Sequence, residues 1–167
     1  MWSLRAQADR RKYQEVMKHT LELQERLQLK QAQVTEVLVE KAIRLLPTGA
    51  IFADLCTGSG CIGLAVAKNV PDARVTLADI SREALAVAKE NITLQKLSAR
   101  VTCTSADALN VPAPFLGKFD IIVSNPPYVM DSEKPLMRTN VLDHEPHLAL
   151  FVPDDDALKF YVAVAQR

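Results

Sequence analysis

The chain is 167 residues long and 49% hydrophobic, which is enough for one domain with a substantial core. Its 20 Lys and Arg residues balance its 20 Asp and Glu residues, so there is no overall positive charge to hold a nucleic-acid backbone. No apolar run approaches the length of a membrane span, and the first residues lack the apolar core of a secretory signal, so no membrane partner is expected.

Cysteine usage indicates a reducing compartment. The three cysteines, Cys56, Cys61 and Cys103, are an odd number and lack the spacing of a metal site. Disulfide frameworks belong to oxidising compartments, whereas free thiols are typical of the cytosol. We therefore expect a cytoplasmic protein that binds no metal ion.

The first 46 residues differ in character from the rest of the chain. Residues 6–46 are rich in Gln, Glu, Lys, Arg and Leu and contain no Gly or Pro. Apolar residues recur there at helical spacing, which predicts one or two amphipathic helices that cover the core. There are more leucines than one helix face needs, so a second copy of the chain could cover some of them. We expect residues 1–46 to form an N-terminal helical arm that ends at Pro47-Thr48-Gly49 and could join two copies in a homo-oligomer.

Strands and helices alternate from residue 47 to residue 167. β-branched runs predict strands, and alanine-rich amphipathic runs predict helices. The expected strands are residues 51–55, 74–78, 101–104 and 119–124, and the expected helices are residues 61–69 and 81–97, the latter with Ser81 as its N-cap. Strands separated by helical crossovers predict an α/β fold with a doubly wound, mostly parallel sheet of about four strands.

A glycine-rich turn follows the first predicted strand. Gly58, Gly60 and Gly63 allow a tight turn and let the backbone approach a ligand at a helix N-terminus. Asp79 ends the second predicted strand 21 residues after Gly58, where a carboxylate can bind ribose hydroxyls. These two features alone also fit a dinucleotide-dependent oxidoreductase.

Two further acids favour a different nucleoside ligand. Asp54 lies four residues before Gly58, and a carboxylate there disfavours a pyrophosphate but tolerates a cationic amino-acid group. Asp107 follows the third predicted strand and could accept a hydrogen bond from an adenine amino group. Either acid alone is more typical of a solvated turn or a loop N-cap, but together they match a nucleoside with a cationic, amino-acid-bearing tail. S-adenosylmethionine is such a molecule.

The fourth predicted strand ends in the sequence Asn125-Pro126-Pro127-Tyr128. Neither proline has a backbone N–H to donate, so the strand cannot continue and the motif forms a rigid, extended turn. Open α/β sheets place their ligands at this carboxyl end of the strands. An amide side chain, proline carbonyls and an aromatic face, held together, suit a planar substrate that carries an NH2 group.

These residues resemble the class I methyltransferases and, among them, the release-factor glutamine N5-methyltransferases of the HemK/PrmC group. Asn-Pro-Pro-Tyr alone also fits adenine-N6 or guanine-N2 methyltransferases. The later Glu145-Pro146, followed by Ala149-Leu150-Phe151, narrows the choice to protein glutamine. The remaining matching positions are Asp54 to Gly63, Asp79-Ile80-Ser81, Ala84-Leu85, Ala88, Asn91, Asp107 and Leu158-x-Phe160-Tyr161.

The resemblance implies S-adenosylmethionine as cofactor and a peptide chain release factor as substrate. It implies cofactor binding by Asp54, Thr57, Gly58, Gly60, Asp79, Ile80, Asp107, Ala108 and Asn125, and substrate binding by Asn125, Pro126, Pro127, Tyr128 and Glu145. The implied catalytic residues are Asn125, Pro126 and Tyr128. The Asn125 oxygen and the Pro126 carbonyl would accept the two amide N–H groups, and Tyr128 would pack on the planar amide. No general base is evident, because His144 and His147 are more typical of surface or loop residues.

The chain also departs from that family. Ala32-Gln33 stand at an Arg-Pro position, Val152-Pro153 stand at a Gly-Gly position, and Arg167 lies inside a helical pattern that begins near Asp155. The family's fold has seven strands, so the strand at 119–124 would be an open apolar sheet edge. We expect a fragment, a chain completed by another copy or partner, or a non-catalytic homologue that acts as a binding module. The isolated chain is predicted to methylate its substrate poorly or not at all.

Overall fold

The computed structural model describes residues 43–111, 115, 118–137, 141–142 and 145–165. They form two compact units, a first unit that ends at Asn125 and a second unit that begins at Pro126. The predicted helical arm lies outside the described residues except for its end, where residues 43–45 are helical. Its role in oligomers and its boundary at residue 46 therefore stay predictions. Among the described residues, no helix combines the length and the apolarity that a membrane crossing requires.

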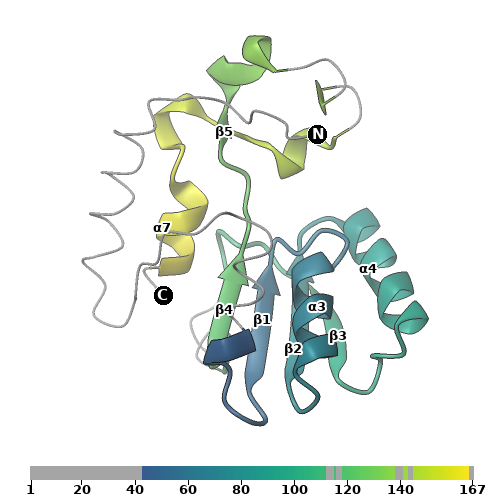
Figure 1. The fold of residues 1–167 in the computed structure, drawn as a ribbon. Helices are drawn as coiled ribbons and strands as arrows, with labels where there is room; N and C mark the ends of the chain where they lie inside the picture. The colour runs from purple at the N-terminus through teal and green to yellow at the C-terminus, as the bar shows by residue number, and fades with distance from the viewer. Residues whose placement is uncertain (1–42, 112–114, 116–117, 138–140, 143–144, 166–167) are drawn as a thin grey trace. The chain divides into compact units, whose positions relative to one another are not determined.

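A four-stranded parallel sheet forms the centre of the first unit (Figure 1). Its order is β3-β2-β1-β4, so β1 lies between β2 and β4 and the winding direction reverses beside it. The strands are β1 (Ile51–Leu55), β2 (Arg74–Asp79), β3 (Val101–Ser105) and β4 (Ile121–Ser124). This confirms the predicted doubly wound parallel sheet, with the predicted strand 119–124 at an edge of the described sheet.

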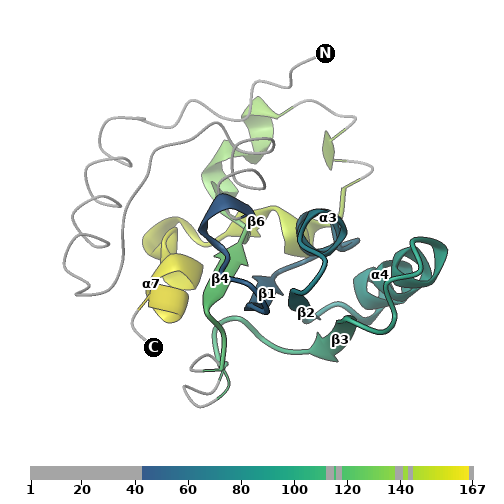
Figure 2. The ribbon, with the colours of Figure 1, turned by 60° about the horizontal axis from the view of Figure 1, so that its bottom comes forward.

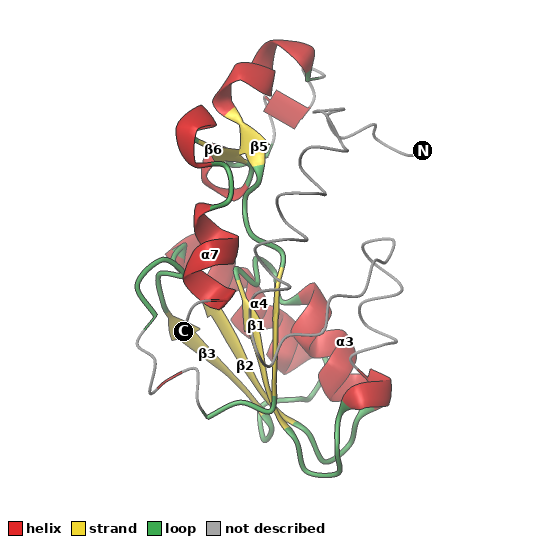
Figure 3. Ribbon diagram, turned by 90° about the vertical axis from the view of Figure 1, so that its left-hand side faces the viewer, coloured by secondary structure: helices red, strands yellow, loops and turns green. Residues whose placement is uncertain are grey.

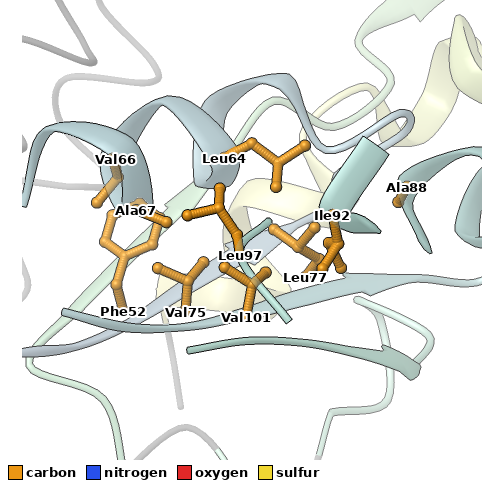
Figure 4. Close-up of a cluster of buried hydrophobic side chains, with 10 residues drawn as sticks. All are labelled: Phe52, Leu64, Val66, Ala67, Val75, Leu77, Ala88, Ile92, Leu97 and Val101. Carbon is orange, nitrogen blue, oxygen red and sulfur yellow. The ribbon is translucent and has the colours of Figure 1, made fainter. Parts of the chain in front are cut away.

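Helices α3 (Cys61–Asn69) and α4 (Arg82–Leu94) connect β1 to β2 and β2 to β3, and both lie on one face of the sheet (Figures 2 and 3). The core forms between these helices and that face. Its buried side chains come from both helices, from three strands and from the turn after α4 (Figure 4): Phe52, Leu64, Val66, Ala67, Val75, Leu77, Ala88, Ile92, Leu97 and Val101. Period-2 alternation directs Val75 and Leu77 to the same face, which is why one strand contributes both.

In the first unit, strands β2 and β3 each end one residue later than predicted, at Asp79 and Ser105, and two other bounds differ by more. Helix α4 ends at Leu94 instead of residue 97, because Lys96 adopts φ 57° and the amides of Lys96 and Leu97 donate back to the carbonyls of Thr93 and Ile92. This is the hydrogen-bond pattern of a Schellman cap. Strand β4 begins at Ile121 instead of 119, because the Asp120 side chain replaces a backbone partner and accepts from the Ile51 amide at 2.7 Å.

A single arginine closes the carboxyl end of α3. The Arg100 guanidinium donates to the carbonyls of Ala67, Val70 and Ala73 at 2.9–3.3 Å. The last carbonyls of a helix have no intrahelical partner and carry partial negative charge, so a half-buried cation stabilises them. Arg100 thereby joins the end of α3 to the start of β3.

Arg100→Met is expected to lower the free energy of unfolding by about 2 kcal/mol, because three carbonyls lose charged donors while the apolar stem is kept. Urea unfolding followed by circular dichroism measures this change. Arg82→Met, on the exposed first turn of α4, is the matched control and is expected to change stability by less than about 0.5 kcal/mol. Equal effects of the two substitutions would contradict the assigned role of Arg100.

The second unit is organised around a two-stranded parallel pair, β5 (Val129–Met130) and β6 (Phe151–Val152). Three short 3-10 helices adjoin the pair: η1 (Asp131–Leu136), η2 (His147–Ala149) and η3 (Asp154–Asp156). The helix predicted from about Asp155 begins at Lys159 instead and is α7 (Lys159–Ala165), because the residues that follow Pro153 form η3. Neither two-residue strand was predicted, since two residues show no periodicity.

Candidate active site

Asp54 is a fully buried carboxylate at the carboxyl end of β1, with 1% of its surface exposed. Its Oδ2 accepts hydrogen bonds from the Thr57 hydroxyl at 2.6 Å and from the Gly63 amide at 2.9 Å. Gly63 lies in the first turn of α3, whose N-cap residue, Gly60, has no side chain to cap it. Asp54 therefore supplies from β1 the acceptor that a Ser or Asp N-cap normally provides.

The turn between β1 and α3 depends on left-handed backbone at Cys56, Gly58 and Gly60, with φ of 56°, 57° and 87°. Gly58 has no atom within 4 Å of the place where a Cβ would be, so its outer side is open to a ligand. A Cβ on Gly60 would lie 2.9 Å from Leu77 Cδ1, so this predicted cofactor residue faces the core. Thr57 is also buried, and its amide donates to the Ala78 carbonyl at the end of β2.

Asp79, the acid at the end of β2, holds the outer part of the same turn. Its Oδ2 accepts from the Gly58 amide at 2.8 Å and its Oδ1 from the Ser81 amide at 2.9 Å. The sequence spacing predicted a ribose-binding role for Asp79, and the structure adds that this carboxylate also accepts from the turn itself. Ser81 is the N-cap of α4, as predicted, and accepts from the Ala84 amide. Ile80 stands between them with 51% of its surface exposed.

Asp107 follows β3 and accepts hydrogen bonds from the loop that comes after it. Its Oδ1 accepts from the Leu109 amide at 2.9 Å and its Oδ2 from the Asn110 side chain at 2.6 Å. Ala108 is buried at 7% exposure beside it. The Ala106 amide donates to the Asp79 carbonyl, so the two acidic loops lie next to each other.

The Cys56 thiol shows that all three acids converge on one place. The pKa of Cys56 is raised to about 11, mainly by burial; the hydrogen bond with Ser124 lowers this pKa, and the negative charges of Asp79, Asp54 and Asp107 add to the rise. The strand register agrees, because Leu55, which follows Asp54, pairs with Ala78, and Asp79 pairs with Ser105, so the three acids leave neighbouring strands at the same edge. The carboxyl edge of the sheet is therefore an anionic cluster, in which no described cationic side chain forms an ion pair with any of the three acids.

Asn125 leaves β4 directly beside the glycine turn. Ser124 pairs with Leu55 in the sheet register, and its hydroxyl donates to the Leu55 carbonyl at 2.9 Å. The residues that follow this pair are Asn125 and Cys56, so an exposed amide side chain emerges next to the turn that Asp54 and Asp79 hold.

The rest of the Asn-Pro-Pro-Tyr motif belongs to the second unit. Pro126 and Pro127 are buried and Tyr128 is half-buried, and the amides of Tyr128 and Val129 both donate to the Leu150 carbonyl at 3.2 and 2.9 Å. The two sequence motifs that suggested a glutamine substrate are thus paired through β5 and β6. Glu145, a predicted substrate residue, is exposed, and its amide donates to the Val141 carbonyl.

Comparison with known proteins decides the family. A sequence profile described as "Methyltransferase small domain" matches residues 28–148. The chain belongs to the methyltransferase small domain family. This membership favours the methyltransferase interpretation of the glycine turn over the oxidoreductase one.

Relatives of this methyltransferase small domain include two curated proteins. A release factor glutamine methyltransferase of Bacteroides thetaiotaomicron is 47% identical over 132 residues, which are 79% of this chain and 47% of that protein. A ribosomal protein uL3 glutamine methyltransferase of Francisella tularensis is 48% identical over 103 residues, 61% of this chain and 32% of that protein. The chain spans less than half the length of each. The solved structure of TrmN from Thermus thermophilus is 30% identical, with a TM-score of 0.50 over 64% of this chain and 32% of that one.

Two residues of the methyltransferase small domain gain importance only from the structure. Asn91 on α4 donates from Nδ2 to the Ser59 carbonyl at 3.0 Å and so holds the glycine turn from the neighbouring helix. Cys56 occupies a left-handed position that favours glycine, and its thiol lies among the three acids. Asn91 belongs to the family resemblance, but the sequence alone did not indicate what it contacts. For Cys56 no sequence signal was available, because backbone φ is not visible in the residue order.

Gly63→Ala is expected to destabilise the fold by about 2 kcal/mol, because the added Cβ would clash with Leu77 Cδ2 and lie 3.1 Å from Val75 Cγ1. Urea unfolding measures the loss. Combined with Leu77→Ala, which removes the clashing methyl group, the effect of Gly63→Ala should become clearly smaller. Additive effects in this double-mutant cycle would exclude the clash as the cause.

Burial raises the pKa of Asp54 from 3.8 to about 6, with Asp79 adding to the rise and the bonds from Thr57 and Gly63 opposing it. Because the folded state holds this proton more tightly than the unfolded state, stability falls as pH rises from about 4 to about 6.

Asp54→Asn removes the buried charge and is therefore expected to raise the free energy of unfolding at pH 7 by about 1–2 kcal/mol. Below pH 4 the advantage should disappear, since the native carboxyl is then neutral in both states. Urea unfolding of both proteins from pH 4 to pH 7 checks this. Parallel stability curves over that range would contradict the raised pKa.

Proposed function

We propose that this chain is the cofactor-binding part of an S-adenosylmethionine-dependent methyltransferase that methylates the side-chain amide nitrogen of a protein glutamine. The observation that carries the proposal is the sheet register that places Asn125 directly beside the glycine turn and the acids that hold it. Asn125, which would bind the substrate amide, thus follows β4, and the neighbouring strand β1 leads into the turn that would bind the nucleoside.

The residues at the carboxyl edge fit S-adenosylmethionine. Asp79 would accept from the ribose hydroxyls, Asp107 from the adenine amino group, and the exposed Ile80 side chain would cover the adenine ring. Gly58 has no side chain and open space beside it, so the cofactor could approach the backbone of the turn there. The buried Asp54 Oδ1 has no hydrogen-bond partner among the described residues, so a cationic tail would satisfy it. When bound, the cofactor supplies a methyl group on a positively charged sulfur.

The chain's own residues then orient the acceptor. An amide nitrogen is a poor nucleophile, because its lone pair is delocalised into the carbonyl. The Asn125 side-chain oxygen and the Pro126 carbonyl would accept its two N–H groups, and Tyr128 would pack on the amide plane. Fixing the nitrogen in this way lowers the barrier by orientation, and the two oxygens favour the positive charge that develops on it. The surplus proton leaves to water after transfer, with no covalent intermediate on the protein.

Protein glutamine is the substrate class best supported by the relatives and by the pairing of the two motifs. The relatives from Bacteroides and Francisella are named for glutamine methylation of a release factor and of ribosomal protein uL3. The Glu145-Pro146 and Ala149-Leu150-Phe151 segments lead into β6, which pairs with the strand that follows Tyr128. We take a peptide chain release factor as the first candidate substrate. The free thiols of Cys56, Cys61 and Cys103 support a cytoplasmic location.

Donor binding is the first test. Calorimetric titration at pH 7 should show S-adenosylmethionine binding, and Asp79→Ala should weaken it by about 10- to 100-fold, because a charged acceptor of the ribose hydroxyls is lost. Asp72→Ala, at an exposed turn before β2, is the matched control and should bind normally. Binding of NAD in place of S-adenosylmethionine would restore the oxidoreductase interpretation.

Methyl transfer is the second part of the test. Because slow turnover is expected of the isolated chain, it is used in excess over a release factor, with labelled donor, and Asn125→Ala is run in parallel. Label on a glutamine that disappears with Asn125→Ala is the expected result. Label on adenine in nucleic acid would support the alternative amino methyltransferase, and donor binding with no transfer to any acceptor would leave a binding module.

A further inference from the structure

The Ser124 side chain joins the end of β4 to the point where β1 becomes the glycine turn. Ser124 is the last residue of β4 and pairs in register with Leu55, the last residue of β1. Its hydroxyl donates to the Leu55 carbonyl at 2.9 Å, and it also shares a hydrogen bond with the thiol of Cys56, the first residue of the turn. One half-buried side chain therefore contacts the residues on both sides of that point.

The directions of these two bonds follow from the single proton of the hydroxyl. That proton is donated to Leu55, so the Cys56 thiol donates its own proton to Ser124 Oγ. The thiol keeps this proton at neutral pH, because the pKa of Cys56 is raised to about 11, mainly by burial. Ser124 thus uses the donor and the acceptor function of its hydroxyl at the same time, and an apolar side chain of the same shape could do neither.

Asn125 follows Ser124 directly and is constrained on its other side by Pro126. The proline ring restricts the residue before it to extended backbone, and its missing N–H prevents a further ladder bond. Asn125 is exposed, so packing contributes little to its position. The direction in which its amide leaves the sheet therefore depends on the anchor at Ser124 and on the ring of Pro126.

We propose that Ser124 is a positioning residue for methyl transfer: its hydroxyl holds the end of β4 against the start of the glycine turn and so fixes the place of the Asn125 amide. This inference rests on the proposed function and deepens it. The Asp79 and Asp54 carboxylates hold the donor-binding turn through bonds that do not involve Ser124. Loss of the hydroxyl should therefore slow transfer more than it weakens donor binding, since a displacement of about 1 Å can cost about 100-fold in rate.

Ser124→Thr and Ser124→Val form a matched pair of variants. Their side chains have nearly the same shape and both suit a strand, but only Ser124→Thr keeps the hydroxyl. Thr102→Val makes the same exchange of hydroxyl for methyl at an exposed position of β3 and is the control. If the added branch prevents folding, Ser124→Ala, which adds no atom, is compared with the unsubstituted chain instead.

The position of Asn125 is measured first, without any ligand, from the NMR relaxation of its backbone amide nitrogen in the 167-residue chain. The order parameter should be about 0.85 in the unsubstituted chain and in Ser124→Thr, as in rigid backbone, and about 0.6 or lower in Ser124→Val. Thr102→Val should leave the Asn125 value unchanged.

Transfer and donor binding are measured next. With the chain in excess over a release factor, Ser124→Val should transfer labelled methyl about 10- to 100-fold more slowly than Ser124→Thr. Calorimetric titration should give both variants a dissociation constant for S-adenosylmethionine within about threefold of the unsubstituted chain, a difference of less than 1 kcal/mol by the conversion of about 1.4 kcal/mol per tenfold. Thr102→Val should match the unsubstituted chain in both measurements.

Equal order parameters at Asn125, or equal transfer rates, in Ser124→Thr and Ser124→Val would overturn the inference and leave the proposed function intact. A loss of donor affinity as large as the loss of rate would place Ser124 in the donor site and overturn it too. Donor binding without transfer by the unsubstituted chain would remove the proposed transfer function itself. A difference in order parameter would then give Ser124 a purely structural role.

Discussion

The hydrogen bonds of the Asp54 carboxylate join the sheet, the glycine turn and the first crossover helix. One oxygen accepts from the turn and from the first turn of α3, so a single side chain on β1 fixes the direction in which the helix leaves the strand. Because Gly60 has no side chain, the helix has no cap of its own. Helix α3 therefore belongs to both the site and the core. Its residue Gly63 packs closely against Leu77 in the core and donates its amide hydrogen to Asp54 in the site.

The Asp54 carboxylate is buried, although burial of a charged group is unfavourable for folding. A buried carboxylate without a cation opposes folding, and Asp79 adds repulsion. Cys56 adds backbone strain at a left-handed position. Strained and electrostatically unfavourable groups gathered at one sheet edge are typical of functional sites, because a ligand of opposite charge compensates them. The hydrogen bonds that Asp79 and Asn91 make with the outer part of the turn hold it in place.

The second unit shows how the acceptor motif is built. Two prolines end hydrogen bonding after β4, and the chain then pairs with a segment more than 20 residues later, through Leu150 and the β5–β6 ladder. Phe151 on that ladder contacts the Lys134 ammonium at 4.6 Å and the His147 ring at 5.2 Å from its centroid. Two segments that are distant in sequence thus support each other.

The order of residues was sufficient for the parallel sheet, its two described helices and the Ser81 cap. Each of these rests on local periodicity, on a capping side chain or on a spacing of residue types, and these signals lie within short stretches of the chain. Tertiary structure alone decided the rest. It placed the Cys56 thiol beside the three acids that the sequence assigned to one ligand site, directed Gly60 toward the core, and paired β5 with β6. It also left Asp54 Oδ1 buried and without a partner among the described residues. These features depend on which atoms meet after the chain has folded, and no property of a single segment encodes that.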